Sequence, residues 1–350
     1  MSKGISKKRL FVYTLIALLL TVGSFAAIYV YKEFSKPIID FHGAKRVELI
    51  IPTGSDFDYV SKELKELGVL TDEQLFRIMA KKKNYQNKVK AGKYVLQDKM
   101  TANALINMLR SGNQPELTFT FNNIRFVDKL AGLAGRKLEL DSADLSKLFH
   151  DDAYTDQFGF NNQTIIAMFI PNTYHFYWNT SADQFMKRMF DEYNKFWTSA
   201  RVKKANEMGL SKLDVSILAS IVQEETNKTE EMSRIAGVYI NRLHRGMLLQ
   251  ADPTARFAYG DFSVKRVTFN YTKIDSPYNT YMYKGLPPGP ICMPNPITID
   301  KVLNYEKHDY LFFCAKPDNS GLHAFAKTNA EHNRNAKAYH DYLDKHRIRY

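Results

Sequence analysis

The chain has 350 residues, of which 45% are hydrophobic and 25% are charged, and its net charge is +12 at pH 7. This length allows one large or two modest domains plus an anchor, and the composition is that of a globular protein. A positive net charge can favour binding to nucleic acid, anionic lipid or an acidic polymer. The sequence, however, contains neither zinc-finger spacing nor an RNA-binding aromatic motif. We therefore expect no nucleic-acid partner and attribute most of the excess charge to a solvated surface.

The N-terminus is typical of a membrane anchor. A basic tail over residues 1–9 precedes an uncharged apolar run from Leu10 to Tyr31, which is long enough to span a bilayer. A cleavable signal peptide has a shorter apolar region that ends in small residues, whereas this run ends in the residues IYVYK. We predict an uncleaved single-pass transmembrane helix over 10–31. The tail would be cytoplasmic, and the rest of the chain would lie on the extracytoplasmic, or periplasmic, side of the cytoplasmic (inner) membrane.

A short tether over residues 32–44 is expected to lead into a small domain of strands and helices. Apolar residues recur there with the periods of strands and amphipathic helices, and Gly68 and Gly112 stand where two of the helices should end. The predicted order is a strand over 47–51, helices over 57–67 and 75–82, a strand over 92–96 and a helix over 102–110.

A second domain is expected to begin at residues 117–121, which alternate as a strand does. Helices are predicted over 127–134, 143–149 and 182–204, the last as one long amphipathic scaffold helix. An aromatic stretch, FIPNTYHFYW, lies between them at 169–178. We interpret its Phe176 and Trp178 as core residues.

Residues 213–254 are the most informative stretch of the sequence. Ser211 followed by Asp214 is typical of a capping box, which predicts the start of a helix. A second helix is predicted over 231–243, with Gly246 as its stop. Polar residues gather at the end of this helix and in a predicted turn after its stop. Such a cluster favours a functional site over a purely structural role: Asn241 and Arg242 at the helix end, then Gln250, Asp252, Pro253 and Thr254 in the turn.

Glu225 is the candidate catalytic residue. Leu218, Ile221 and Val222 share one face of the first helix at about 100° per residue. Glu225 lies in the middle of that face, and Gln223 points nearly the opposite way. A buried carboxylate is costly unless it is paired or protonated, and burial raises its pKa toward the range of a general acid. The alternative is a Glu225 that is solvated where the helix leaves the core, or that pairs with an arginine.

The C-terminal third combines irregular and rigid segments. Residues 255–275 are predicted to be irregular, and a proline- and glycine-rich loop follows over 276–291. Because such a loop holds a set shape, it is a suitable place for binding residues. Short strands are predicted over 310–315 and 321–325, and the last helix is expected to open at residues 328–333.

The sequence gives no strong metal or disulfide signal. Cys292 and Cys314 form no CxxC motif, so we interpret them as buried free thiols, with a disulfide as the alternative if the domain is extracytoplasmic. His323, Glu331 and His332 make a weak zinc pattern, because their order is neither HExxH nor its inverse. We expect no metal and no cofactor.

Several motifs together resemble those of the endolytic murein transglycosylases, the MltG/YceG-like family. They are SIVQEET, GVYINRL and LQADPT in the central stretch, PNTY at 171–174, SPYNTY at 276–281, GLPPGPI at 285–291 and the pattern HxFxxTxxEHN from His323. The resemblance covers most of the chain after about residue 45, although Asn172 stands where the family has an aspartate.

The resemblance implies that the first central helix carries a catalytic glutamate. The family pattern is a Glu, a variable residue and a second Glu; this chain has Gln223 at the first position, which leaves Glu225. It also implies an α+β fold, with a LysM-like subdomain over 45–116, either a binder of N-acetylglucosamine polymers or a spacer, and a catalytic domain over 117–350. The side chains that we expect at the substrate are Asn241, Gln250, Asp252, Thr254, Tyr278, Asn279, Thr280, Asn172, Tyr174, His323 and Glu331.

The function that the resemblance implies is lytic cleavage of the bond between N-acetylmuramic acid and N-acetylglucosamine in peptidoglycan. Cleavage would leave 1,6-anhydro ends and would terminate or trim nascent strands. The expected partners are glycan strands, the inner membrane and cell-wall synthesis enzymes. The alternatives are a non-catalytic peptidoglycan-binding scaffold and a metal-dependent wall peptidase or amidase that uses His323, Glu331 and His332.

Overall fold

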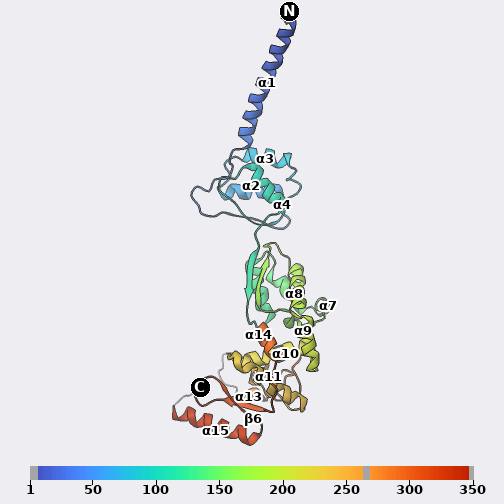
Figure 1. The fold of residues 1–350 in the computed structure, drawn as a ribbon, viewed down its shortest axis with the longest axis vertical. Helices are drawn as coiled ribbons and strands as arrows, with labels where there is room; N and C mark the ends of the chain where they lie inside the picture. The colour runs from blue at the N-terminus through green and yellow to red at the C-terminus, as the bar shows by residue number, and fades with distance from the viewer. Residues whose placement is uncertain (1–6, 263–268, 347–350) are drawn as a thin grey trace, which may run out of the picture. The chain divides into compact units, whose positions relative to one another are not determined.

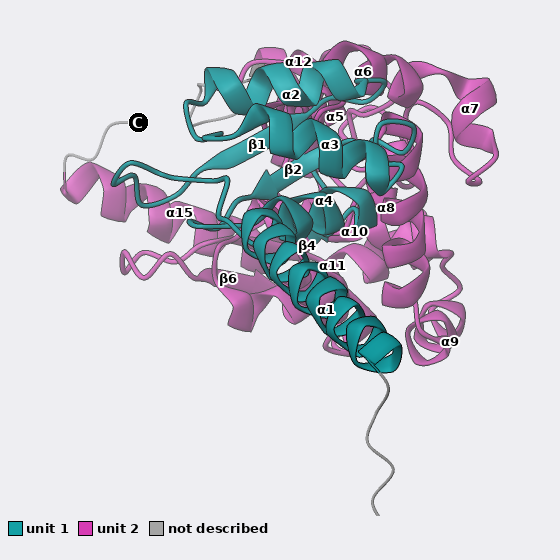
Figure 2. Cartoon of the chain, turned by 90° about the horizontal axis from the view of Figure 1, so that it is seen from above, with its two compact units in different colours: residues 1–117, 175–179 teal, residues 118–174, 180–350 magenta. Residues whose placement is uncertain are grey.

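The computed structural model describes residues 7–262 and 269–346. The chain divides into two compact units (Figure 2): unit 1 comprises Met1–Leu117 and His175–Asn179, and unit 2 comprises Thr118–Tyr174 and Thr180–Tyr350. Both units mix helices with short strands, which pair as two-stranded sheets. The predicted α+β class is therefore confirmed.

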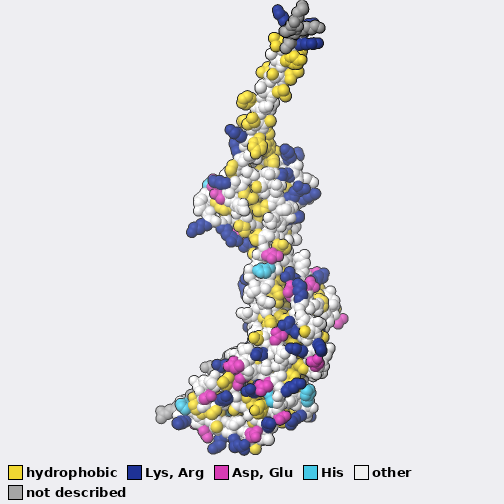
Figure 3. All heavy atoms as spheres, in the orientation of Figure 1, with side chains coloured by type: hydrophobic (Ala, Val, Ile, Leu, Met, Phe, Trp, Pro, Cys, Tyr) yellow, Lys and Arg dark blue, Asp and Glu magenta, His cyan; other side chains and the backbone are white. Residues whose placement is uncertain are grey.

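The first element, α1 (Lys7–Phe34), is a helix of 28 residues that is long and apolar enough to cross a membrane. At 1.5 Å per residue it is about 42 Å long. Its apolar side chains are exposed, and Figure 3 shows them as a largely hydrophobic surface along the helix. Hydroxyls on α1 donate back to its own carbonyls, from Thr14 to Phe11 (2.9 Å) and from Ser24 to Leu20 (2.8 Å), so they need no water. The apolar helix expected at the N-terminus is confirmed as a candidate membrane span.

Unit 1 combines an antiparallel sheet with three further helices (Figure 1). β1 (Glu48–Ile51) pairs with β2 (Gly92–Val95). The helices α2 (Phe57–Glu66), α3 (Glu73–Lys82) and α4 (Ala102–Ser111) each bury apolar residues in the same core. The strands and helices predicted between residues 47 and 110 are all confirmed, whereas the likeness of this unit to LysM domains stays a prediction.

The helices of unit 1 begin at side-chain caps. Asp56, Asp72 and Thr101 accept hydrogen bonds from backbone N–H groups in the first turns of α2, α3 and α4. Gly112 ends α4 with φ of +75°, a left-handed conformation that glycine adopts without a steric cost.

The prediction of a tether over residues 32–44 is wrong. Ile38 and Ile39 are almost fully buried in the core of unit 1, and backbone bridges join Pro37 to Thr101 and Ile39 to Leu70. Two adjacent isoleucines are too few to show the hydrophobic periodicity of a helix or a strand. The sequence around them therefore does not predict that they lie in the core.

Unit 2 begins with the two-stranded sheet of β3 (Leu117–Phe121) and β4 (Asn172–Phe176). Phe121 and Tyr174 stack across it with 5.6 Å between ring centroids, and Phe176 is buried as predicted. The helices of this half are α5 (Val127–Lys137), α6 (Ser142–His150), α7 (Asp152–Asp156), the 3₁₀ turn η1 (Ile165–Met168), α8 (Ala182–Phe196) and α9 (Ser199–Glu207).

The single helix predicted over 182–204 is instead the pair α8 and α9. Trp197, with ψ of 68°, leaves the helical conformation and buries its ring. Thr198 then caps α9 by accepting a hydrogen bond from the backbone N–H of Arg201. Apolar spacing continues across this break, so periodicity alone predicts one helix.

The second half of unit 2 is built around α10 (Lys212–Glu225), which packs against α11 (Thr229–His244), α12 (Asp252–Tyr259) and α14 (Pro296–Leu303). The capping box of Ser211 and Asp214 is confirmed. All residues from Val215 to Gln223 are buried. The inference that α10 buries one stripe is therefore wrong: this helix is covered all round.

The chain ends in a small sheet covered by a helix. β5 (Phe312–Ala315) pairs antiparallel with β6 (His323–Ala326), and α15 (Asn329–Lys345) packs on both. Both strands and the start of the last helix are as predicted. Thr328 and Glu331 form the capping box of α15.

The prediction of irregular chain over 255–275 is wrong at both of its described ends. The predicted turn at Asp252 and Pro253 is the first turn of α12, where the missing N–H of proline removes no helical hydrogen bond. A short helix, α13 (Phe269–Thr272), follows later. Residues 263–268 of this stretch lie outside the described residues.

Candidate active site

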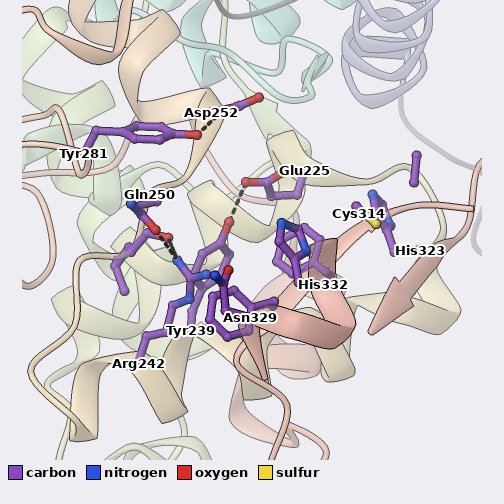
Figure 4. Close-up of a pocket in the computed structure, with 14 residues that line it drawn as sticks. Glu225, Tyr239, Arg242, Gln250, Asp252, Tyr281, Cys314, His323, Asn329 and His332 are labelled. Atoms are coloured by element: carbon purple, nitrogen blue, oxygen red, sulfur yellow. Dashed lines mark hydrogen bonds between the residues drawn. The ribbon is translucent and has the colours of Figure 1, made fainter. Parts of the chain in front are cut away.

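A cavity of about 490 Å³ lies at the C-terminal end of α10, and Glu225, the last residue of that helix, lines it (Figure 4). The other polar walls include Tyr239 and Arg242 on α11, Asp252 on α12, His323 on β6 and His332 on α15. This volume is within the range of small-molecule sites, which bury most of a ligand's surface.

Tyr239 holds the carboxyl group of Glu225. Its hydroxyl donates a hydrogen bond to Oε1 of Glu225 at 2.5 Å. The Tyr239 ring is buried, with its edge against Phe313 at 5.9 Å between centroids. Burial raises the pKa of Tyr239 well above its ordinary value, so its phenol remains a donor throughout the neutral range.

Burial raises the pKa of Glu225 to about 8. The hydrogen bond from Tyr239 acts in the opposite direction because it stabilises the carboxylate, and the charge of Asp252 adds to the rise. Arg256 and Arg242 oppose the rise through their positive charge, but desolvation is the largest cause. Glu225 is therefore mainly protonated at neutral pH, as a general acid must be.

The neighbouring Glu224 has a different environment. Its carboxylate accepts hydrogen bonds from Arg125 at 2.5 Å, Asn123 at 3.0 Å and Arg256 at 3.3 Å. These contacts join α10 to the segment before α5 and to α12. The arginine pairing considered for Glu225 thus belongs to Glu224, whose charge is compensated by two cations.

Gln223 braces the chain on another side of α10. Its Oε1 accepts hydrogen bonds from the backbone N–H of Asn295 at 2.6 Å and the hydroxyl of Thr298 at 3.1 Å. Its side chain is buried and does not line the cavity of Glu225. This residue, which replaces the first glutamate of the family pattern, fixes the start of α14.

Arg242 ties three segments together below the cavity. Its guanidinium donates to the carbonyl oxygens of Leu311 at 2.6 Å and Leu249 at 2.8 Å, and to the side chain of Gln250 at 3.3 Å. The guanidinium also lies over the Phe312 ring, 5.2 Å from its centroid. Because buried backbone carbonyls require donors, Arg242 holds the 248–250 segment and β5 against α11.

Asp252 is placed in the cavity by two adjoining loops. The backbone N–H of Gln250 donates to the carbonyl of Thr280 at 3.0 Å, which joins the 250–252 segment to the 276–281 loop. The hydroxyl of Tyr281 then donates to Asp252 at 2.5 Å (Figure 4). Gln250 itself has φ of +49°.

Two histidines lie on the far side of the cavity from this pair of loops in Figure 4. His323 is held by Glu231, which accepts from its backbone N–H at 2.8 Å and pairs with its Nδ1 at 3.0 Å. His332 stacks on Phe312 at 5.4 Å. Among the described residues its Nδ1 is buried without a hydrogen-bond partner, and burial lowers the pKa of its imidazole.

Four of the site residues predicted from sequence line this one cavity: Glu225, Gln250, Asp252 and His323. They come from α10, the loop before α12, α12 and β6, so the fold brings together residues almost 100 positions apart in the sequence. Glu225 is the only one of the four on α10.

Four further predicted residues make internal hydrogen bonds behind the cavity. The Thr254 and Thr280 hydroxyls lie 2.7 Å apart, and both side chains are almost completely buried. The Asn279 amide donates to carbonyls of its own loop, including that of Ile274 at 2.8 Å, and Asn241 donates to the carbonyl of His308 at 2.7 Å. These side chains shape the loops that carry the lining residues.

The other predicted residues lie elsewhere in unit 2. Tyr278 lines a second cavity. Tyr174 is buried and its hydroxyl donates to the carbonyl of Ile170, while Asn172 is exposed on β4. The Glu331 carboxylate accepts from the backbone N–H groups of Lys327 and Thr328 at the start of α15. Substrate contact by these residues stays a prediction.

Sequence reasoning did not place Tyr239, Tyr281 or His332 at the substrate, although His332 was part of the weak zinc pattern. Tyr239 shares the apolar face of α11, where its spacing predicts a core residue, and only the buried neighbour Glu225 reveals its polar role. Tyr281 and His332 belong to the motifs at 276–281 and 323–333, which gave no means of choosing these side chains from their neighbours.

The zinc pattern of His323, Glu331 and His332 is not assembled as a ligand set. Glu331 caps α15, and His323 is paired with Glu231. Over residues 7–262 and 269–346, no group of three His, Cys, Asp or Glu side chains is arranged to hold a metal ion. Cys292 and Cys314 are both free thiols, the first buried and the second partly exposed.

Comparison with known proteins relates most of the chain to one group of proteins. Residues 49–338 match the model of the YceG-like family. A Bacillus subtilis protein named endolytic murein transglycosylase is 32% identical over 311 residues, which are 84% of this chain and 84% of that protein. A Streptococcus pneumoniae protein of the same name is 28% identical over 85% of this chain, which spans 59% of the pneumococcal protein.

A solved structure gives the same relation. The crystal structure of a YceG-like protein from Listeria monocytogenes matches with a TM-score of 0.54 and 27% sequence identity, over 83% of this chain and 98% of the other. Family match, sequence identity and fold agree, and the chain belongs to the YceG-like family.

Proposed function

We propose that this chain is a membrane-anchored lytic transglycosylase of peptidoglycan in which Glu225 supplies both proton transfers. The observation that carries the proposal is the position of Glu225, whose carboxyl group lines a cavity of about 490 Å³ and accepts a hydrogen bond from Tyr239; burial there raises its pKa to about 8. Membership of a family whose relatives are named endolytic murein transglycosylases supports the activity.

The first step is protonation of the glycosidic oxygen. The carboxyl group of Glu225 donates its proton to the glycosidic oxygen, which joins C1 of N-acetylmuramic acid to C4 of N-acetylglucosamine. The C1–O bond breaks, and the N-acetylglucosamine side leaves with a free 4-hydroxyl. Glu225 is then a carboxylate, and the hydrogen bond from Tyr239 stabilises that form.

The second step returns the proton. The Glu225 carboxylate accepts a proton from the C6 hydroxyl of the same muramic acid while the C6 oxygen bonds to C1. The product is a 1,6-anhydro end, Glu225 is protonated again, and no water is consumed. Ordinary glycosidases need a second carboxylate to activate water or to attack C1, but this route needs a single acid that becomes the base.

Asp252 is the second carboxylate of the cavity, and we assign it an electrostatic role. Its charge helps to raise the pKa of Glu225, and Tyr281 holds its carboxylate. Gln250 and His323 also line the cavity, where an amide and an imidazole can hydrogen-bond the hydroxyl and N-acetyl groups of the substrate.

We further infer that α1 anchors the enzyme in the cytoplasmic membrane, with its N-terminus inside and the chain that follows α1 outside. The basic residues before the apolar run support this orientation. There the enzyme would meet nascent glycan strands and the enzymes that synthesise them, and unit 1 would act as a LysM-like glycan binder or a spacer.

The test is product analysis with two matched variants. Purified peptidoglycan is digested with the wild type, Glu225→Gln and Glu230→Gln, and the fragments are identified by mass spectrometry. Glu230 is exposed in the first turn of α11 and does not line the cavity, so its substitution is the control for a glutamate-to-glutamine change outside the site. We expect anhydro ends from the wild type and the control, and none from Glu225→Gln.

Other outcomes identify the alternatives. Reducing ends would indicate hydrolysis, with Asp252 as the second carboxylate. Cut peptides would indicate a peptidase, and glycan binding without any cut product would indicate a scaffold. Full activity of Glu225→Gln would refute the assignment of the catalytic residue.

A further inference from the structure

A second cavity, of about 360 Å³, lies in unit 2. It shares no lining residue with the cavity that holds Glu225. Its walls come from the start of α5, the segment before η1, α12 and the loop over 276–291. The catalytic steps proposed above use none of its side chains.

An aromatic row forms one wall of this second cavity. Phe126 and Phe257 stack with 6.0 Å between ring centroids and an interplanar angle of 27°. Phe257 and Tyr278 follow at 4.8 Å. Phe126 is 41% exposed, so part of its ring is open to a ligand in this cavity.

The charged groups around the aromatic row are already compensated. Arg125 is paired with Glu224 at 2.5 Å, and His150 lies 3.0 Å from Asp128, which also accepts from Ser146. The polar side chains that remain at the opening are the exposed amides of Asn162 and Gln163. Aromatic faces beside neutral amides suit a neutral ligand that carries C–H faces, hydroxyls and an acetamido group.

The two cavities are joined by two shared elements. Asp252 lines the first and Phe257 the second, and both are on α12, about 8 Å apart along its axis. On the neighbouring loop, Tyr281 likewise lines the first cavity and Tyr278 lines the second. Both cavities therefore border the same short helix and the same loop.

We propose that this second cavity is a subsite for a distal N-acetylated sugar of the same glycan strand, whose ring stacks on Phe126 and Phe257. The proposal rests on the proposed function for the identity of the polymer. The compensated charges argue against a stem peptide as the occupant, because its carboxylate and amino groups would find no unpaired partner in the described wall.

The first test is the dependence of cleavage on substrate length. The value of kcat/KM is measured for short and long uncrosslinked glycan oligomers with the wild type, Phe126→Leu and Phe257→Leu. Leucine keeps apolar volume but removes the ring face, so a merely structural role would be little affected. We expect the ratio of long-chain to short-chain kcat/KM to fall about tenfold in each variant.

The matched control is Tyr259→Leu, which removes another exposed ring from α12 that does not line the cavity. It should keep the wild-type length ratio. A wild-type ratio in both phenylalanine variants, or an equal fall in Tyr259→Leu, overturns the subsite.

The second test does not depend on catalysis. Binding of N-acetylglucosamine oligomers is measured by calorimetry in Glu225→Gln and in Glu225→Gln combined with Phe257→Leu. A dissociation constant raised about tenfold by Phe257→Leu supports the subsite even if the wild type cuts no glycan, an outcome that would defeat the proposed function alone. Unchanged affinity, or a free stem peptide that competes with the sugar, contradicts the subsite.

Discussion

Adjacent glutamates of α10 illustrate how surroundings, rather than residue type, decide the chemistry of a carboxyl group. The carboxylate of Glu224 forms ion pairs with Arg125 at 2.5 Å and Arg256 at 3.3 Å. Glu225 accepts a hydrogen bond from Tyr239 in a desolvated site. Desolvation outweighs the effect of this hydrogen bond and raises the pKa of Glu225 to about 8. The helix thus places a structural ion pair and a proton donor on consecutive residues.

Tyr239→Phe tests the balance at Glu225. The hydrogen bond from Tyr239 lowers the pKa of Glu225 against the larger effect of burial, so its removal should raise that pKa above 8. We expect the alkaline limb of the pH profile of kcat/KM to move to higher pH, with a fall in rate of about tenfold as carboxylate stabilisation is lost. An unchanged limb would mean that Glu225 does not set it.

The stability of Glu225→Gln tests the raised pKa without any substrate. The folded pKa of about 8 lies above the unfolded one, which is about 4.3. The protonated group's contribution is therefore complete below about pH 4.3 and is lost as pH rises through about 8. Glutamine does not titrate, and its side-chain oxygen can still accept from Tyr239.

We therefore expect the variant to gain stability relative to the wild type between pH 5 and pH 8, by about 1.4 kcal/mol for each unit of pKa shift. Urea unfolding in detergent at several pH values measures this difference. A difference that is constant with pH, or that has the opposite slope, would show that Glu225 is ionised in the folded state.

At this scale the sequence predicts the catalytic candidate but not its partners. Glu225 is found because a carboxylate follows an apolar helix, although the helix is in fact covered on all sides. Tyr239, Tyr281 and His332 approach Glu225 and Asp252 only in the folded chain. Tyr239 has the spacing of an ordinary core residue, and the motifs that contain Tyr281 and His332 do not distinguish these side chains from their neighbours.

The packing of helix α11 against the chain before β5 depends on a missing side chain. A Cβ atom on Gly237 would lie 2.4 Å from the carbonyl oxygen of Glu306 and 2.6 Å from Nε2 of His308. Gly132 on α5 has only the flexible side chain of Arg136 near that position, at 3.6 Å. The two helical glycines thus have opposite surroundings.

Alanine at these positions should have opposite effects on stability. Replacing a helical glycine with alanine normally adds up to about 1 kcal/mol, and we expect this gain for Gly132→Ala. Gly237→Ala forces backbone apart, which should cost about 1–3 kcal/mol and outweigh the helical gain. Denaturant midpoints of the two variants measure the effects, and equal midpoints would contradict the close packing of α11.

At the scale of elements, strands, caps and glycine stops were predictable because they are local. Ser211, Asp214 and Gly112 act within a few residues of their place in the sequence. The failures have tertiary causes: Trp197 leaves the helical path to bury its ring, and Ile38 is recruited by a core whose other members follow it in the chain.

At the scale of the whole molecule, the proposed anchoring by α1 would determine where the rest of the chain acts. The fold predicts one membrane crossing, which we test with cysteine substitutions at its two ends. A membrane-impermeant maleimide added to intact cells, or to spheroplasts where an outer membrane is present, should label Ser35→Cys and leave Lys8→Cys unlabelled. The chain with its native Cys292 and Cys314 replaced by serine is the background.

The same labelling experiment can also contradict the proposed membrane topology. Labelling of Lys8→Cys alone would reverse the orientation, and labelling of both would indicate that α1 does not cross the membrane. Lysed cells serve as the control, since both positions should then react.

The most direct test of the central claim is the source of the new oxygen at C1 of muramic acid. Peptidoglycan is digested in water enriched in ¹⁸O, and the muramic acid ends are analysed by mass spectrometry. If Glu225 takes the proton of the C6 hydroxyl as its base, the ends are anhydro sugars that carry no ¹⁸O and are absent with Glu225→Gln. Reducing ends that contain ¹⁸O, or unlabelled anhydro ends from Glu225→Gln, would contradict this account.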